Sequence, residues 1–153
     1  MATDMSDEAR REFLSFGTRT AKLAVSRKNG APHVVPIWFV LDGDDVIFTT
    51  SEKTVKGKAI LRDQRVALCV DDDTPPFSFV SIEGTVTISR DPDDLLAWAT
   101  RLGDRYMGED QAEECGRRNA VPEEMLIRVT TTQSVAVAGR SDGGGARGAD
   151  VRQ

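Results

Sequence analysis

The sequence predicts a small, mainly antiparallel β-barrel with flanking helices, and three observations support this fold class. Five or six apolar or alternating runs have the length of strands. Two connections carry tight-turn signals, Asn29-Gly30 and Asp42-Gly43-Asp44. Two helices interrupt the strands, as in small antiparallel barrels. With 153 residues the chain suffices for one such domain.

The first expected element is a short helix. Ser6 is suited to cap its N-terminus, and Asp7 and Glu8 favour the positive end of its dipole. Gly17 ends it. Residues 21–26 then alternate small or apolar with polar side chains, which predicts a half-buried strand.

The return strand of the first hairpin is expected over residues 32–41. It is almost wholly apolar, which is typical of a strand buried on both faces. Pro36 removes one backbone donor, so the strand must lie at a sheet edge or carry a bulge there. Residues 45–50 form the third expected strand.

The rest of the domain is expected to hold further strands around two helical regions. The expected elements are a helix at about 54–63, a strand at 65–70, a loop at 71–76, a strand at 77–89 with a bend at Gly84, a helix capped by Asp91 with Pro92 in its first turn, a polar helical piece at 109–118 and a last strand from Met125 to about Val137. Residues 1–139 are expected to form the domain, and 140–153 a disordered tail.

Composition excludes several classes of protein. Hydrophobic residues make up 39% and charged residues 29%, and no apolar run has the length of a membrane-spanning helix. The net charge of −5 does not favour nucleic-acid binding. The acidic, polar N-terminus is unlike a secretion signal, so a cytoplasmic protein is expected.

The sequence offers little for metal or thiol chemistry. With one histidine, His33, and no CxxC pair, a zinc site has nothing to be built from. Cys69 lies in an apolar run and is expected to be buried, whereas Cys115 lies in a polar helical stretch. The acidic run at residues 71–73 is interpreted as a solvated or capping loop rather than a metal site.

A basic cluster stands out in this acidic chain. Its members are Lys53, Lys56, Lys58, Arg62 and Arg65. Lysines at the start of a helix oppose its dipole, which indicates that an anion such as phosphate binds there. Hydroxyl groups that are suited to join such a site are those of Thr49, Thr50, Ser51 and Thr54. The pattern alone equally allows a solvated cluster, paired with Glu52 and Asp63.

The same region resembles a known family. The segment Phe48-Thr49-Thr50-Ser51-Glu52, followed by Lys56-Gly57-Lys58, is similar to the flavin-phosphate segment of pyridoxamine-phosphate-oxidase-like proteins. Residues 30–39 resemble the family's second strand, and Ser81-Ile82-Glu83-Gly84-Thr85-Val86 its strand ending in Glu-Gly. With residues 105–108, the resemblance extends over about 13–137.

The resemblance implies a homodimeric split β-barrel with cofactor sites at the subunit interface. Lys56 would hold the cofactor phosphate, and Lys53 and Lys58 would reinforce it or reach a charged tail. Thr49 and Thr50 would lie near the phosphate and the side chain of the cofactor. The full set of cofactor-binding residues predicted in this way is Val35, Pro36, Ile37, Trp38, Thr49, Thr50, Ser51, Lys53, Lys56 and Lys58.

One departure from the family pattern bears on the cofactor. The oxidase proper has Ser-Arg-Lys where this chain has Thr54-Val55-Lys56. The lost arginine argues against FMN, and the chain looks closer to the actinobacterial branch that uses the deazaflavin F420.

The resemblance therefore implies an F420-dependent oxidoreductase that transfers a hydride between the deazaflavin ring and a planar, conjugated small molecule. No catalytic side chain is identified; Tyr106 is one conceivable proton source, and Arg105 and Tyr106 equally suit simple helix packing. The alternatives are a protein of the same fold that binds F420, FMN or haem without turnover, and a cofactor-free interaction domain. For haem, His33 would be the only obvious axial ligand, and a structural role for it is favoured.

Overall fold

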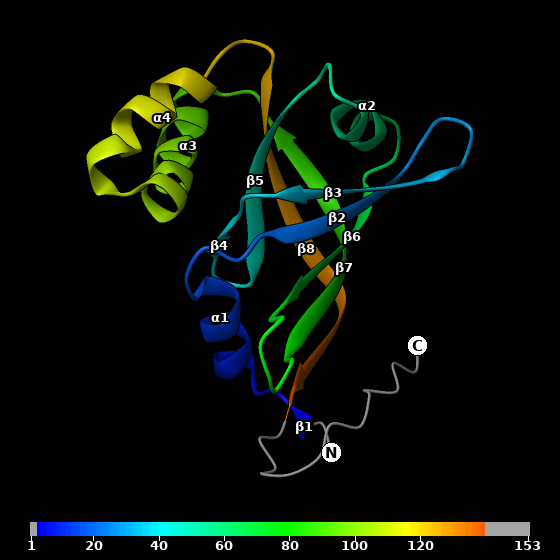
Figure 1. Cartoon of the computed structure of the whole chain (residues 1–153). Helices are drawn as coiled ribbons and strands as arrows, with labels where there is room; N and C mark the ends of the chain where they lie inside the picture. Colours follow the sequence, from blue (N-terminus) through cyan, green and yellow to red (C-terminus); the bar gives the residue numbers. More distant parts are fainter. Residues whose placement is uncertain (1–2, 140–153) are drawn as a thin grey trace.

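An antiparallel sheet of eight strands carries the fold within residues 3–139, the part of the chain that the computed structural model describes (Figure 1). The strands are β1 (Thr3–Asp4), β2 (Ala21–Ser26), β3 (Pro32–Ile37), β4 (Val40–Asp42), β5 (Asp45–Ser51), β6 (Arg65–Asp71), β7 (Phe79–Ser89) and β8 (Glu124–Ala138). The helices are α1 (Asp7–Ser15), α2 (Val55–Arg62), α3 (Pro92–Met107), the 3₁₀ turn η1 (Glu109–Gln111) and α4 (Ala112–Asn119). The predicted fold class, mainly β with flanking helices, is confirmed. The tail predicted at 140–153 lies outside the described residues.

The sheet is curled by one short connection. Its strand order is β3-β2-β6-β7-β8-β5-β4, so β3 and β4 lie at opposite ends of the order. These two strands are nevertheless consecutive in the chain and are joined only by Trp38 and Phe39. Since the three Cα–Cα steps from Ile37 to Val40 reach no more than about 11 Å, the two sheet edges must come together. The connection therefore closes a barrel that hydrogen bonds alone leave open.

The prediction of one strand over residues 32–41, buried on both faces, was wrong. The segment is divided into β3 and β4, and β3 has only β2 as a neighbour. One face of this edge strand meets solvent, and Val34 is 66% exposed. The prediction that Pro36 lies at an edge is confirmed, since an edge strand tolerates a residue without an N–H.

Two apolar clusters occupy the two faces of β5. Inward-facing Val46 and Phe48 belong to the main core inside the barrel. Between them in sequence, Ile47 faces outward and packs with Leu95 of α3 and Leu126 of β8. This alternation follows from the period of two in a strand. It also sends Thr49, two residues after Ile47, toward the outer face that α3 covers.

Close packing joins α3 and α4 into a helical hairpin. A Cβ on Gly103 would lie 2.6 Å from the Cβ of Cys115, and one on Gly116 would overlap Thr100. Two glycines thus allow the helices to touch, and Cys115, expected in a polar stretch, is only 4% exposed. Cys69, expected to be buried, is only partly buried.

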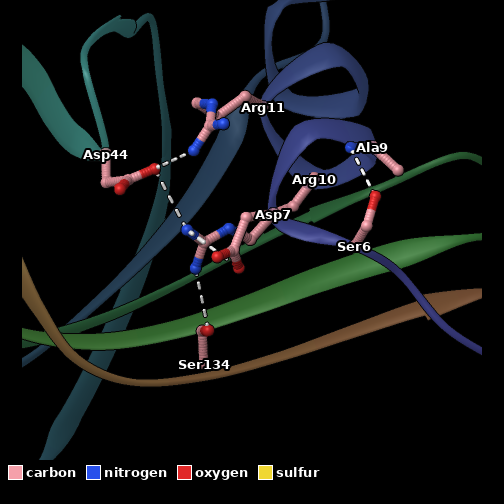
Figure 2. Close-up of polar contacts among 7 residues, drawn as sticks. All are labelled: Ser6, Asp7, Ala9, Arg10, Arg11, Asp44 and Ser134. Atoms are coloured by element: carbon pink, nitrogen blue, oxygen red, sulfur yellow. Dashed lines mark hydrogen bonds and ion pairs between the residues drawn. The ribbon is translucent and has the colours of Figure 1, made fainter.

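Ion pairs hold α1 against the sheet, as Figure 2 shows. Arg10 donates to Asp44 in the β4–β5 turn at 3.1 Å and to Ser134 of β8 at 3.0 Å. Arg11 donates to the same Asp44 oxygen at 3.0 Å, and this contact, with Arg10, holds the pKa of Asp44 below its usual value. The predicted cap is confirmed, because the Ser6 hydroxyl accepts from Ala9 N at 3.1 Å.

The predicted bend at Gly84 is confirmed as a shift of register between β7 and β8. The shift falls between Glu83 and Gly84. A Cβ at Gly84 would lie 2.6 Å from the carbonyl oxygen of Thr130. The pairing therefore requires the absence of a side chain there.

We expect Gly84→Ala to lower the free energy of unfolding by about 1–3 kcal/mol, because the new methyl group forces the β7–β8 ladder apart. Urea denaturation measures the loss. Thr87→Ala, at an exposed position of the same strand, is the control and should change stability much less. Equal stability of Gly84→Ala and the wild type would contradict the close approach.

Candidate cofactor-binding pocket

A cavity of about 360 Å³ lies on the outer side of the barrel. It is bounded by the end of β3, by β5, by the start of α2 and by the α3–α4 hairpin. Its lining residues are Pro36, Ile37, Trp38, Thr49, Lys56, Ala99, Leu102, Gly103, Cys115, Arg118, Asn119 and Glu124. The volume is in the usual range for small-molecule sites.

The closing connection of the barrel forms one wall of the pocket. Trp38 is 41% exposed, and its ring stacks on Tyr106 of α3 with centroids 4.9 Å apart and planes at 4°. Tyr106 thus covers part of one face of the indole, and the ring borders the cavity. A flat ligand can therefore stack on this ring. Pro36 and Ile37 line the same wall, whereas Val35 packs against the main core.

Arg105 and Tyr106 hold this wall in place. Arg105 donates to the carbonyl oxygens of Phe39 at 2.6 Å, Leu14 at 2.7 Å and Gly17 at 2.9 Å. The Tyr106 hydroxyl donates to the carbonyl of Arg19 at 2.8 Å and accepts from Phe39 N at 3.2 Å. Burial raises the pKa of Tyr106. Its hydroxyl is thus committed to the backbone, which favours packing over the proton-donor role considered for it.

The hydroxyl groups at the start of α2 are largely used in its cap. Thr54 Oγ1 accepts from Gly57 N at 3.0 Å and lies 3.0 Å from Thr50 Oγ1. Thr50 is only 2% exposed, and Ser51 Oγ accepts from Lys53 N at 3.2 Å. Gly57 is required here, because a Cβ would overlap the carbonyl of Ser51. Of the predicted hydroxyl residues, Thr49 is the one that lines the pocket.

The three lysines near this helix start differ in their surroundings. Lys53 pairs with Glu123 at 2.7 Å, and this hydrogen bond raises the pKa of Lys53. Lys58 is exposed and does not line the pocket. Lys56 does line it, and within residues 3–139 it forms no ion pair. The structure therefore places one of the three predicted ammonium groups in the cavity.

The solvated pairing considered above is present for one member of the basic cluster, Arg65, and absent for its lysines, as far as Glu52 and Asp63 are concerned. Glu52 pairs with Arg90 at 2.7 Å, and Asp63 pairs with Arg65 at 2.8 Å. Neither carboxylate is thus available to Lys56. An anionic ligand is the partner that suits this ammonium group.

Sequence reasoning missed Glu124, which lies at the start of β8 opposite Ser51 of β5. Burial raises the pKa of Glu124 above its usual 4.5, while the charge of Lys56 and a hydrogen bond to Thr49 oppose the shift. The missed signal was the spacing of two residues between Glu124 and Leu126. It places the carboxyl on the outer face that α3 covers.

Sequence reasoning predicted a polar helical piece at 109–118, which the structure has as η1 and α4, but it missed the part of α4 in the pocket. Cys115, Arg118 and Asn119 contribute its part of the lining. No pattern in the sequence marks them, because only the packing of α4 on α3 brings them to the sheet.

The remaining candidates lie elsewhere. His33 Nδ1 lies 3.1 Å from the Arg27 guanidinium and does not line the pocket. Asp71 and Asp72 pair with Lys22 and Arg19. Among residues 3–139, no cluster of three His, Cys, Asp or Glu side chains is placed to hold a metal ion. No helix in the same range has both the length and the apolar character needed to cross a bilayer.

A curled antiparallel sheet with a pocket on its outer face defines a split β-barrel. A family model described as pyridoxamine 5'-phosphate oxidase matches residues 6–137. The chain belongs to this family, and the resemblance recognised in its sequence is confirmed. A search of curated proteins found no match.

Solved structures agree with this assignment. A conserved hypothetical protein from Mycobacterium tuberculosis superposes with a TM-score of 0.80 at 24% identity, over 97% of this chain and 95% of the other. A protein described as an F420 reductase has 30% identity and a TM-score of 0.64, over 80% of this chain and 94% of its own. The haem storage protein HutZ from Vibrio cholerae shares the fold, with 15% identity and a TM-score of 0.69, over 88% of this chain and 97% of its own.

We expect Tyr106→Phe to lower the free energy of unfolding by about 1–2 kcal/mol, because it removes the hydrogen bonds to Arg19 and Phe39 but keeps the stacked ring. Urea unfolding measures the loss. Asp104→Asn, at an exposed position of the same helix, is the control. If both variants unfold alike, the hydroxyl does not stabilise the closure.

The raised pKa of Glu124 predicts that ionisation of this carboxyl lowers the stability of the protein. A carboxyl whose pKa is higher in the folded state makes the protein less stable as pH rises through that pKa. Glu124→Gln removes the ionisation, so we expect it to be more stable than the wild type at pH 8 by a few tenths of a kcal/mol, since solvent screens this half-exposed group. The gain should vanish at pH 4.

Denaturant unfolding at both pH values measures this difference. Glu123→Gln is the matched control: its carboxylate pairs with Lys53, so it should bring no gain at pH 8. A Glu124→Gln variant less stable than the wild type at pH 8 would contradict the burial cost.

Proposed function

We propose that this pocket binds the deazaflavin cofactor F420 and that the protein is an oxidoreductase acting on a planar, conjugated small molecule. One observation carries the proposal: the cavity combines an exposed indole, Trp38, with an ammonium group, Lys56, that forms no ion pair within residues 3–139. These are the two kinds of group that a flat ring attached to a phosphate requires. The likeness to an F420 reductase supports the same cofactor.

The residues present fit an anionic, ring-bearing cofactor. Lys56 would hold its phosphate, with Thr49 beside it, and Pro36, Ile37 and Trp38 would flank its ring. The order Thr54-Val55-Lys56 supplies one cation where the oxidase proper has two, which favours F420 over FMN. Val35, Thr50, Ser51, Lys53 and Lys58 remain predictions for a complete site, in which a second subunit would take part.

When bound, the cofactor supplies the hydride chemistry. The chain itself binds and orients. Trp38, fixed by Tyr106, sets the plane in which a flat ring lies. Leu102 and Ile37 would give the ring apolar contacts. The carboxyl of Glu124 lines the cavity and is able to hold a proton there.

The proposal also includes a homodimer with its cofactor sites at the subunit interface and a cytoplasmic location. Several large apolar side chains are exposed on the described chain, among them Val34 of the edge strand β3. Such side chains are suited to an interface between subunits.

Fluorescence titration with F420 and with FMN tests the cofactor. We expect micromolar or tighter binding of F420 and weaker binding of FMN. Lys56→Ala should weaken F420 binding about tenfold or more, because it removes a charge-assisted contact to phosphate. Lys28→Ala, an exposed lysine of the β2–β3 turn, is the charge-matched control and should bind normally.

Reoxidation of reduced F420 by a panel of quinones then tests turnover. Binding without reoxidation would identify a carrier of the cofactor rather than an enzyme. If neither cofactor binds the wild type, the proposed function is wrong.

A further inference from the structure

Three pocket residues come from one face of α4. Cys115, Arg118 and Asn119 follow the spacing i, i+3 and i+4, which aligns side chains along a helix. Asn119 Nδ2 donates to the Cys115 carbonyl at 2.9 Å. The face that α4 presents to the cavity is thus polar, although nothing in the proposed cofactor site uses it.

The guanidinium of Arg118 is directed over this face. Glu114 precedes it by four residues, a spacing suited to an ion pair, yet Arg118 forms no ion pair within residues 3–139. Its Nη2 instead contacts Cys115 Sγ at 3.7 Å. The adjacent Arg117 pairs with Glu113 at 3.9 Å. Both arginines lie in the last turn of α4, where the helix dipole stabilises a positive charge on either of them. The dipole therefore does not explain why only Arg118 lines the pocket.

The platform under Arg118 is rigid. Gly103 and Gly116 bring α3 and α4 into backbone contact, with Cys115 and Thr100 filling the space between them. A side chain carried by such a packed hairpin keeps its position relative to the cavity. Arg118 itself is exposed, but the backbone that carries it belongs to this packed hairpin, and its guanidinium contacts Cys115 at the edge of the cavity.

Arg118 and Lys56 belong to different walls of the pocket. Figure 1 shows α2 and the α3–α4 hairpin on opposite sides of β5. Apolar residues line the cavity as well, among them Ile37, Trp38 and Leu102. Glu124 also lines the cavity, and the cation it interacts with is Lys56. A ligand with one anionic group, bound at Lys56, would leave Arg118 without a counter-charge. The arrangement suits bound molecules that carry two anionic groups, one for each cation, with flat apolar rings between them.

We propose that Arg118, assisted by Asn119, binds a carboxylate of the substrate, so that the protein acts on planar conjugated acids. This inference rests on the proposed function for the cofactor at Lys56. The planar fork of arginine matches a carboxylate through two parallel hydrogen bonds, which lysine does not provide. Arg118 is thus a specificity-determining residue for the substrate, separate from the phosphate site.

Equilibrium dialysis with 2-naphthoate and 2-naphthamide tests the inference, since the two probes differ in charge but little in shape. The measurement uses the full chain, once alone and once with F420. We expect the wild type to bind the acid about tenfold more tightly than the amide. Arg118→Ala should remove this preference without changing amide binding, and Arg118→Lys should restore part of it.

Two controls separate this site from the cofactor site. Arg117→Ala, at the ion-paired neighbour, should leave the preference for the acid unchanged. F420 titration should show normal binding to Arg118→Ala and weakened binding to Lys56→Ala.

The outcomes are distinct. Equal binding of acid and amide by the wild type overturns the inference, as does a loss of F420 binding in Arg118→Ala equal to that in Lys56→Ala. If F420 fails to bind the wild type while the acid still binds through Arg118, the carboxylate site stands and the proposed cofactor is wrong.

Discussion

The fold depends on the barrel closure at Trp38 and Phe39. These two residues join β3 and β4, the strands at the two edges of the sheet. A connection this short leaves no slack, so its backbone groups must find partners where the barrel edges meet. Arg105 and Tyr106 provide them: the carbonyl of Phe39 accepts from Arg105, and its N–H donates to Tyr106. Burial lowers the pKa of Arg105, and three carbonyl oxygens offset much of the cost of removing its charge from water.

The same closure makes stability and binding inseparable in this protein. The indole that offers a flat surface to the cavity is held by Tyr106, which also anchors the adjacent backbone. A change at α3 therefore acts on the pocket wall as well as on the barrel. The opposite wall has its own support in the cap of α2, where Thr54 and Gly57 fix the helix that carries Lys56. Each wall is thus positioned by contacts that lie behind it.

The features of the fold that depend on a few neighbouring residues were predictable from the sequence. The hairpins, the caps at Ser6 and Asp91 and the irregularity at Gly84 follow from a few neighbouring residues, and the structure has all of them. The division of residues 32–41 was not predictable from apolar content, because an edge strand and a central strand differ in their neighbours rather than in their own side chains. Lys56 was predicted as a site residue because it lies at the start of a helix. The places of Glu124 and Arg118 in the pocket depend on which faces of β8 and α4 meet α3, and the sequence does not show this.

Ion pairing decides which charges of this acidic protein remain for a ligand. Around α2, Lys53 before its start, Arg65 after its end and Arg90 beside Glu52 are each paired with a carboxylate within 3 Å. Lys56, in the first turn of α2, has no such partner, and the carboxyl of Glu124, whose pKa its charge lowers, is disfavoured as an anion by burial. The two cations that line the cavity, Lys56 and Arg118, outnumber its one carboxyl, Glu124, so the local field is positive inside a chain of net charge −5. Because this field is confined to the cavity, it attracts only anions that fit there, and the rest of the acidic surface does not bind them.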